Sequence, residues 1–151
     1  METNPSAVIN EQKKNEKSMV VNTLRAFNFR NFNNVEIDFC DSVNIIKGMN
    51  AQGKTNLLES ILLSLSAKSH RESNYRNFIG QYADSASVYL NGVDIDGLDF
   101  EVEASFSEEK SLSINGRTIR RRSELGSMFS FIFFGPDELS IIKGAPYQRR
   151  A

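Results

Sequence analysis

The segment from Gly48 to Thr55 has the residue types and the spacing needed to bind a polyphosphate. It fits the pattern G-x-x-x-x-G-K-[ST] of the phosphate-binding loop. The two glycines let the backbone curl so that successive N–H groups point at the phosphates. Lys54 can reach the β- and γ-phosphates, and the Thr55 hydroxyl can ligate Mg²⁺. The pattern predicts a nucleotide site formed by Gly48, Met49, Asn50, Ala51, Gln52, Gly53, Lys54 and Thr55.

A phosphate-binding loop needs a strand before it and a helix after it. Residues 42–47 are β-branched and apolar enough to predict a buried strand. The N-terminus of the following helix would add partial positive charge toward a bound phosphate. The alternative is a glycine-rich turn in front of an ordinary helix. Apolar residues at helical spacing predict one buried face of that helix, formed by Leu58, Ile61, Leu62 and Leu65.

Most of the remaining chain is patterned as strands. Alternating apolar residues predict strands over 20–29 and 35–39, and a series of short strands over 84–119. Asn115-Gly116 predicts a tight hairpin turn inside that series. Two strands before the loop and an antiparallel patch after it are similar to the first lobe of an ABC-type ATPase head.

The apolar run 129–134 predicts one more buried strand, and a short helix is expected to begin at Asp137. Asp137 and Glu138 could be mistaken for the acidic Walker B pair. In that motif, however, the acid follows its strand directly, whereas Gly135-Pro136 intervene here. We therefore interpret this segment as the equivalent of the Q-loop of ABC-type ATPases and not as Walker B.

The composition sets the class of protein. The 151 residues suffice for one domain, and 18 basic against 19 acidic side chains give no nucleic-acid signal in the net charge. The single cysteine, Cys40, excludes an intrachain disulfide, favours an intracellular and cytoplasmic protein, and is expected to serve packing. No apolar run is long enough to predict a membrane span. Residues 1–18 read as a disordered polar tail.

Six motifs in order make the chain resemble the N-terminal part of the RecF family of bacterial DNA replication and repair proteins. LRAFNFRNF at 24–32 resembles the family's L-x-x-x-N-F-R-N, and NAQGKTNLLE at 50–59 resembles N-G-Q-G-K-T-N-L-L-E. Further matches are SHR at 69–71, ING at 114–116, FGPDEL at 134–139, and KGAP at 143–146 followed by Arg149 and Arg150. Ala51 replaces a usual glycine, which the loop is expected to tolerate.

The resemblance covers residues 19–151 and implies an α/β fold, the partial first lobe of an ABC-type P-loop ATPase head with an antiparallel side sheet. It implies ATP and Mg²⁺ as cofactors. It also implies an ATP-dependent head-to-head homodimer in the complete protein, which binds single-stranded and gapped or linear double-stranded DNA. The family works with recombination mediator proteins, supports recombinase loading and SOS induction, and has no membrane association.

The family continues beyond position 151 with a signature motif and a Walker B pair. This chain is therefore expected to be a truncated lobe that binds ATP without hydrolysing it and holds no catalytic residue. Two alternatives remain open. One is a stand-alone P-loop kinase or GTPase-like domain, and the other is a catalytically dead remnant.

Four arginines are candidates for DNA contact: Arg71, Arg120, Arg121 and Arg122. Arg71 belongs to the SHR motif, in a region where SMC-type relatives of the family touch nucleotide or DNA. The other three follow the hairpin together with Arg117, where the alternative is a solvated surface neutralised by Glu124 and other acids. His70 is more simply explained as a hydrogen-bonded structural residue. Asn56 either supports the Mg²⁺ site indirectly or lies on a polar surface.

Overall fold

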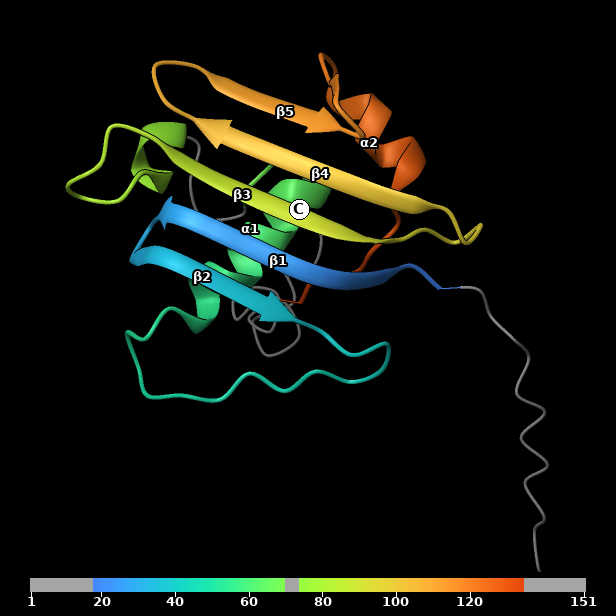
Figure 1. Cartoon of the computed structure of the whole chain (residues 1–151), viewed down its shortest axis with the longest axis horizontal. Helices are drawn as coiled ribbons and strands as arrows, with labels where there is room; N and C mark the ends of the chain where they lie inside the picture. Colours follow the sequence, from blue (N-terminus) through green and yellow to red (C-terminus); the bar gives the residue numbers. More distant parts are fainter. Residues whose placement is uncertain (1–17, 70–73, 135–151) are drawn as a thin grey trace, which may run out of the picture.

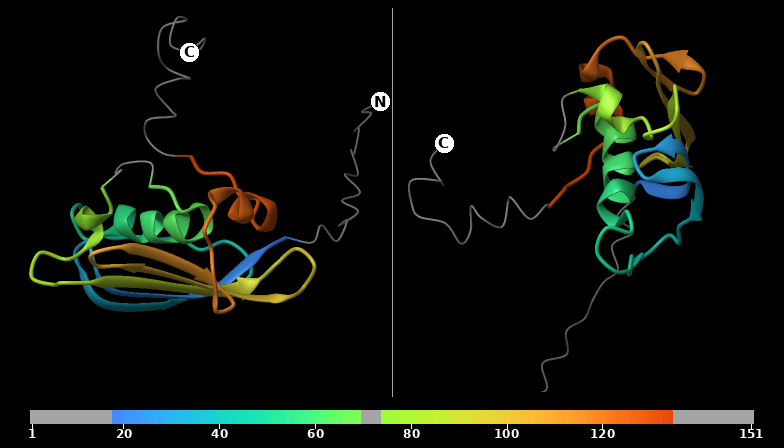
Figure 2. Two further views of the ribbon diagram at one scale, coloured as in Figure 1. Left: turned by 90° about the horizontal axis from the view of Figure 1, so that it is seen from above. Right: turned by 90° about the vertical axis from the view of Figure 1, so that its left-hand side faces the viewer.

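A computed structural model describes residues 18–69 and 74–134 of the chain. The elements are β1 (Val20–Phe29), β2 (Phe32–Asp38), α1 (Lys54–Ser66), the 3₁₀ turn η1 (Tyr75–Phe78), β3 (Ala86–Val93), β4 (Asp99–Phe106), β5 (Lys110–Ile114), β6 (Arg117–Thr118) and α2 (Arg122–Met128). The strands form one sheet in the order β2-β1-β3-β4-β5-β6, and all neighbours are antiparallel (Figure 1). Both helices lie on the same side of this sheet (Figure 2).

The strands predicted from alternation before the loop and over residues 84–119 are confirmed. On β3 every second residue is buried, from Ala86 through Val88 to Leu90, because successive side chains point to opposite faces. The hairpin predicted at Asn115-Gly116 is also confirmed. Both residues have positive φ, 48° and 76°, which matches the twist of the flanking strands β5 and β6.

The core lies between the sheet and the helices. Three phenylalanine rings meet there: Phe78 stacks on Phe29 with ring centroids 5.7 Å apart and meets the edge of Phe106 at 5.2 Å. Phe100 on β4 packs against Phe129, which follows α2, at 5.0 Å. Offset and edge-on ring pairs of this kind add stabilisation beyond the area they bury.

The opposite face of the sheet is polar and negatively charged. Glu101 and Glu103 on β4 point away from the core, since Val102 between them is buried and successive side chains of a strand alternate between its faces. Arg25 on β1 pairs with Glu36 on β2 at 2.9 Å, and both side chains remain more than half exposed. We call this surface the acidic outer face; it consists of Glu36, Asp38, Glu101 and Glu103, with Arg25 among them.

The buried face predicted for α1 is wrong in most positions. Of the four predicted residues only Leu65 is buried, whereas Leu58 is 44% exposed and the other two are half-buried. The helix turns a different side to β3, β4 and α2. That side includes the buried Ser60 and Ser64, whose hydroxyls find partners in the helix backbone. Ser60 donates to the Leu57 carbonyl at 2.7 Å, and Ser64 donates to the Ser60 carbonyl at 3.0 Å.

Two predicted buried strands are absent. Residues 42–47 form no strand, and Val43 and Ile45 are 79% and 73% exposed. Residues 129–134 likewise form no strand; Phe129 is buried, but Ile132 is 85% exposed. A strand needs a hydrogen-bonded neighbour, and within the described ranges neither segment pairs with one. Residues 1–17 of the tail predicted over 1–18 lie outside the described residues, and so does the helix expected at Asp137.

Candidate nucleotide-binding site

The predicted phosphate-binding loop leads directly into α1. Gly53 is the residue before the helix, at φ +95°, and its carbonyl accepts the first helical bond from the Leu57 N–H at 2.9 Å. The first-turn N–H groups of α1 therefore begin at the loop, where an anion is favoured. Ala51 also has positive φ, +65°, a region that strains a residue with a Cβ. Ala51 therefore has a conformation that glycine adopts more readily, and the expectation that the loop tolerates alanine here stays a prediction.

Lys54 folds back over the loop that precedes it. Its Nζ donates to the Gly48 carbonyl at 2.8 Å and to the Met49 carbonyl at 2.6 Å. The Met49 N–H donates to Gln52 Oε1 at 2.9 Å, which closes the loop from the other side. The ammonium group and the curled backbone thus share one small volume. A phosphate that enters this volume would replace the two carbonyls as the partner of Lys54.

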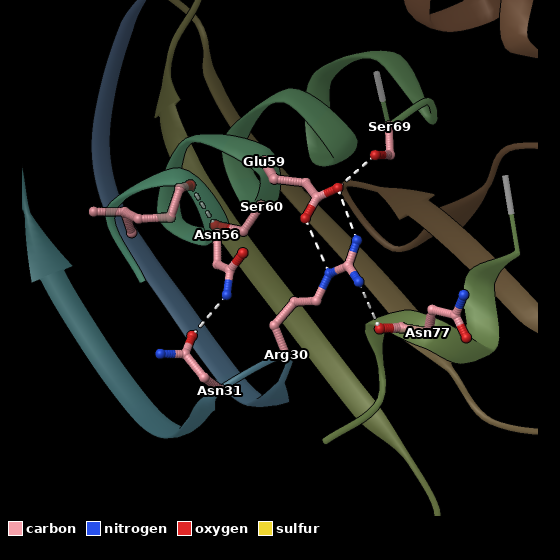
Figure 3. Close-up of polar contacts among 8 residues, drawn as sticks. Arg30, Asn31, Asn56, Glu59, Ser60, Ser69 and Asn77 are labelled. Atoms are coloured by element: carbon pink, nitrogen blue, oxygen red, sulfur yellow. Dashed lines mark hydrogen bonds and ion pairs between the residues drawn. The ribbon is translucent and has the colours of Figure 1, made fainter. Parts of the chain in front are cut away.

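The turn between β1 and β2 packs against the loop. A Cβ placed on Gly53 would lie 2.7 Å from the Phe32 ring and 2.9 Å from the Asn31 side-chain nitrogen. Asn56 Nδ2, on the first turn of α1, donates to Asn31 Oδ1 at 2.8 Å (Figure 3). This contact ties Asn56 to the neighbouring turn and tests neither of the two interpretations of this residue. Glycine is required at 53 by the backbone angle and by this close approach.

A buried ion pair lies one helical turn further along α1. The Glu59 carboxylate is fully buried and accepts from Arg30 Nε and Nη2, each at 3.0 Å (Figure 3). The Ser69 hydroxyl also donates to Glu59. Arg30 reaches η1 as well, because Nη1 donates to the Asn77 carbonyl at 3.0 Å and the guanidinium lies 4.9 Å from the Phe78 ring centroid. The pair therefore joins α1 to three other segments.

This ion pair is not among the sites predicted from the sequence, where Arg30, Glu59 and Ser69 occur only as parts of the family motifs. The signal that could have found it is Glu59 itself, the one acidic residue of α1, next to leucines in the sequence, because a carboxylate that faces the core must have a partner. The partner itself lies 29 positions away, which helical or strand spacing does not reveal.

A polar groove of about 590 Å³ opens beside this cluster. Its walls come from the β1–β2 turn, the first turn of α1 and the segment after η1. Side-chain amides dominate the lining, and the residues that carry them are Asn28, Asn31, Asn33, Asn56, Asn77 and Gln81. Such a lining offers hydrogen-bond donors and acceptors, and the one charged side chain among its described residues is Arg30, which pairs with Glu59.

The DNA candidates are only partly described. Arg120 and Arg121 are exposed and line a groove of about 210 Å³ together with Lys110, whose Nζ donates to the Ala67 carbonyl at 2.8 Å. We call this the basic groove. Arg117 lies 3.5 Å from Glu124, so part of the cluster is neutralised, as the alternative interpretation holds. Arg122 is the first residue of α2, and Arg71 and His70 lie outside the described residues.

Cys40 does not serve packing, contrary to expectation, because its side chain is exposed. It lies in a turn closed by Asn44, whose Oδ1 accepts from the Cys40 N–H at 3.0 Å and whose Nδ2 donates to the Cys40 carbonyl at 2.9 Å. Hydrogen bonds from the Ser42 hydroxyl and then the Ser42 backbone lower the pKa of the Cys40 thiol below its ordinary value. The strand end that would have buried this residue continues instead into an exposed loop.

The described part of the chain contains no helix that is long and apolar enough to cross a membrane. Among the same residues, no three or more histidine, cysteine, aspartate or glutamate side chains gather where they could hold a metal ion.

Comparisons with known proteins identify the family. The model of the AAA domain family matches residues 23–135. Over 134 residues the chain is 38% identical to the DNA replication and repair protein RecF of Lachnoclostridium phytofermentans and 40% identical to that of Clostridium acetobutylicum. Each of these alignments covers 87% of this chain and 37% of the relative, so the chain spans little more than a third of the length of these relatives.

Solved structures show the same relationship. A structure described as the recombination mediator protein RecF-ATP in the RecFOR pathway superposes with a TM-score of 0.78 at 31% identity, covering 89% of this chain and 37% of that one. An SMC ATPase structure superposes with a TM-score of 0.72 at 23% identity, covering 86% and 95%, and shares the fold. The predicted α/β fold of an ABC-type ATPase head with an antiparallel sheet is confirmed. The chain belongs to the AAA domain family and is similar to the N-terminal part of the DNA replication and repair protein RecF.

Proposed function

We propose that residues 48–55 bind the phosphates of ATP. The observation that carries the proposal is the position of Lys54, whose ammonium group is held within 2.6–2.8 Å of two carbonyls of the loop at the point where α1 begins. One cation and several first-turn N–H groups thus converge on one volume. This combination suits a polyphosphate.

Each part of the loop has a physical role in this proposal. The N–H groups of the loop and of the first turn of α1 donate to phosphate oxygens, and Lys54 neutralises the β- and γ-phosphates. Thr55 is exposed on the first turn of α1, where its hydroxyl can face the same phosphates. One hydroxyl alone holds Mg²⁺ weakly, and the described residues gather no group of carboxylates beside it. Mg²⁺ would therefore bind together with the nucleotide, through phosphate oxygens and Thr55.

The larger proposal is that this chain is the ATP-binding part of a cytoplasmic RecF-type protein of DNA replication and repair. Similarity to RecF proteins supports it, and so does the basic groove at Lys110, Arg120 and Arg121. In the complete protein two heads would close over ATP and bind single-stranded, gapped or linear double-stranded DNA. Together with recombination mediator proteins, this dimer would support recombinase loading and SOS induction.

Titration of the 151-residue chain with Mg-ATP tests the proposal. Lys54→Ala removes a charge-assisted contact worth roughly 1.5–3 kcal/mol, so affinity should fall about ten- to a hundredfold. Lys47→Ala is the matched control, since it removes an exposed lysine just before the loop. It should bind like the unaltered chain. Equal affinities of the Lys54→Ala variant and the unaltered chain would refute the site.

A further inference from the structure

Stability alone does not explain the buried pair of Arg30 and Glu59. Glu59 is fully buried and Arg30 only 19% exposed, so both charges have lost most of their hydration. Burying an ion pair generally gains little over packing apolar side chains of similar volume in its place. Such a pair fixes the relative orientation of its two side chains, because a guanidinium donates two hydrogen bonds to a carboxylate in only a few arrangements. The two bonds of 3.0 Å, from Nε and Nη2 to separate oxygens, have this forked arrangement.

The fork fixes the turn that rests on the phosphate-binding loop. Arg30 itself has positive φ, +57°, so the chain reverses sharply at this residue. The next residue, Asn31, bonds to Asn56 on the first turn of α1, and Phe32 then lies against Gly53. Neither Arg30 nor Glu59 lies in the loop. The two residues after Arg30, however, contact Asn56 on the first turn of α1 and Gly53 just before it.

We propose that the Arg30–Glu59 pair positions the phosphate-binding loop. The pair sets the β1–β2 turn on α1, and the turn in turn holds Gly53 and Asn56 where the helix N-terminus can receive phosphate. Loss of the pair lowers nucleotide affinity without removing any group that touches the nucleotide. This inference rests on the proposed function of residues 48–55.

The test compares Mg-ATP affinity among variants of the 151-residue chain. Arg30→Met and Glu59→Gln each break the pair with side chains of similar size. The matched controls Arg25→Met and Glu36→Gln break an exposed pair, 2.9 Å long, between β1 and β2, the two strands that the turn connects. Circular dichroism at the titration temperature verifies that each variant is folded.

A second control separates positioning from general destabilisation. Leu112 is buried on β5 at the far side of the sheet from β2, so Leu112→Ala weakens the fold without touching the loop. If the pair served only stability, the folded Leu112→Ala variant and the Glu59→Gln variant would show the same small change in affinity. Arg30→Lys is the conservative variant, since it keeps the charge but offers one donor group instead of a fork.

The expected result is a loss of affinity of about three- to thirtyfold for Arg30→Met and for Glu59→Gln, the range typical of residues that act on a site through others. The double variant should lose no more than either single one, because the two residues act as a unit. Arg30→Lys should recover part of the loss, while the controls at 25, 36 and 112 stay within twofold of the unaltered chain.

The outcomes distinguish this inference from the proposed function. If Lys54→Ala weakens binding but Glu59→Gln binds like Glu36→Gln, the positioning role is refuted and the nucleotide site stands. An equal loss in Leu112→Ala and Glu59→Gln also refutes it. If the unaltered chain and Lys54→Ala bind alike, the nucleotide site itself fails, and the inference with it.

Discussion

Gly53→Ala should be among the most damaging single-methyl changes in this chain. The backbone at 53 has φ +95°, and forcing a Cβ into the left-handed region costs roughly 1–2 kcal/mol. The new methyl would also lie 2.7 Å from the Phe32 ring and 2.9 Å from the Asn31 amide. Relieving such overpacking costs roughly 1–3 kcal/mol more. The sum, roughly 2–5 kcal/mol, is a large fraction of the stability of a small domain.

The chain contains a matched control for the backbone part of this cost. Gly97 has φ +84°, and a Cβ there would meet nothing within 4 Å. Gly97→Ala should therefore cost only the roughly 1–2 kcal/mol of the left-handed conformation. Both variants stiffen the unfolded chain equally, so that contribution cancels in the comparison. The difference between Gly53→Ala and Gly97→Ala isolates the approach of the β1–β2 turn to the loop.

Urea unfolding followed by circular dichroism measures this difference through the two midpoints. A rescue variant sharpens the test, since Phe32→Ala in the Gly53→Ala background removes the ring that the methyl would strike. The double variant should lose less than the sum of the two single losses, with a coupling of roughly 0.5–3 kcal/mol. Equal midpoints for Gly53→Ala and Gly97→Ala, or strictly additive losses with Phe32→Ala, would show that the turn does not press on the loop.

Three further predictions concern chemistry and binding. Iodoacetamide should alkylate Cys40 faster at neutral pH than a free cysteine, and Ser42→Ala should slow the reaction, since the substitution removes the Ser42 hydroxyl hydrogen bond, the largest cause of the lowered thiol pKa, and leaves the Ser42 backbone bond. An unchanged rate contradicts this. Phosphate release by the 151-residue chain should not exceed that of Lys54→Ala, because the described residues contain no cluster of three or more acidic, histidine or cysteine side chains that could hold Mg²⁺. Turnover that depends on Lys54 would refute this prediction. DNA affinity, measured by anisotropy, should fall as salt rises, whatever the DNA sequence. The double variant Arg120→Ala, Arg121→Ala should show a weaker dependence on salt. Affinity that is independent of salt would refute this prediction.

Strand patterns were the most predictable part of this fold. The alternation along residues 20–29 and 86–93 identifies both the strands and the face that packs on the core, because one side of the sheet is covered and the other is not. Asn115-Gly116 locates a hairpin, since few residue pairs adopt two successive left-handed angles. Local geometry decides these features, so a local pattern reveals them.

The buried face of α1 and the two strands that did not form could not be predicted from residue spacing, because both depend on which neighbouring segments they contact. Apolar residues lie around much of α1, so periodicity alone offers more than one face. The face that packs carries Leu57, Leu63 and Leu65 together with the small side chains of Ser60 and Ser64. Residues 42–47 have the composition of a strand but no neighbour within the described residues. Composition indicates what a segment can become, whereas hydrogen-bonded pairing decides what it is.

The sequence predicts the loop of the candidate site, but it does not predict the ion pair behind that loop. Gly48, Gly53 and Lys54 form a contiguous motif whose spacing has a mechanical reason. Arg30 lies in the β1–β2 turn and Glu59 on α1, 29 positions later, so they are neighbours only in the folded structure. A buried carboxylate indicates that a cationic side chain lies nearby, but it does not identify which residue that is.

The acidic outer face gives the molecule an electrical polarity. Its carboxylates lie on one side of the sheet, while the basic groove lies at the end of α1 on the other side. A polyanion approaching within a screening length, about 8 Å at physiological ionic strength, is therefore repelled by one side and attracted by the other. The domain would turn its helices toward such a partner before any specific contact forms. Added salt would abolish this rotational preference together with the attraction.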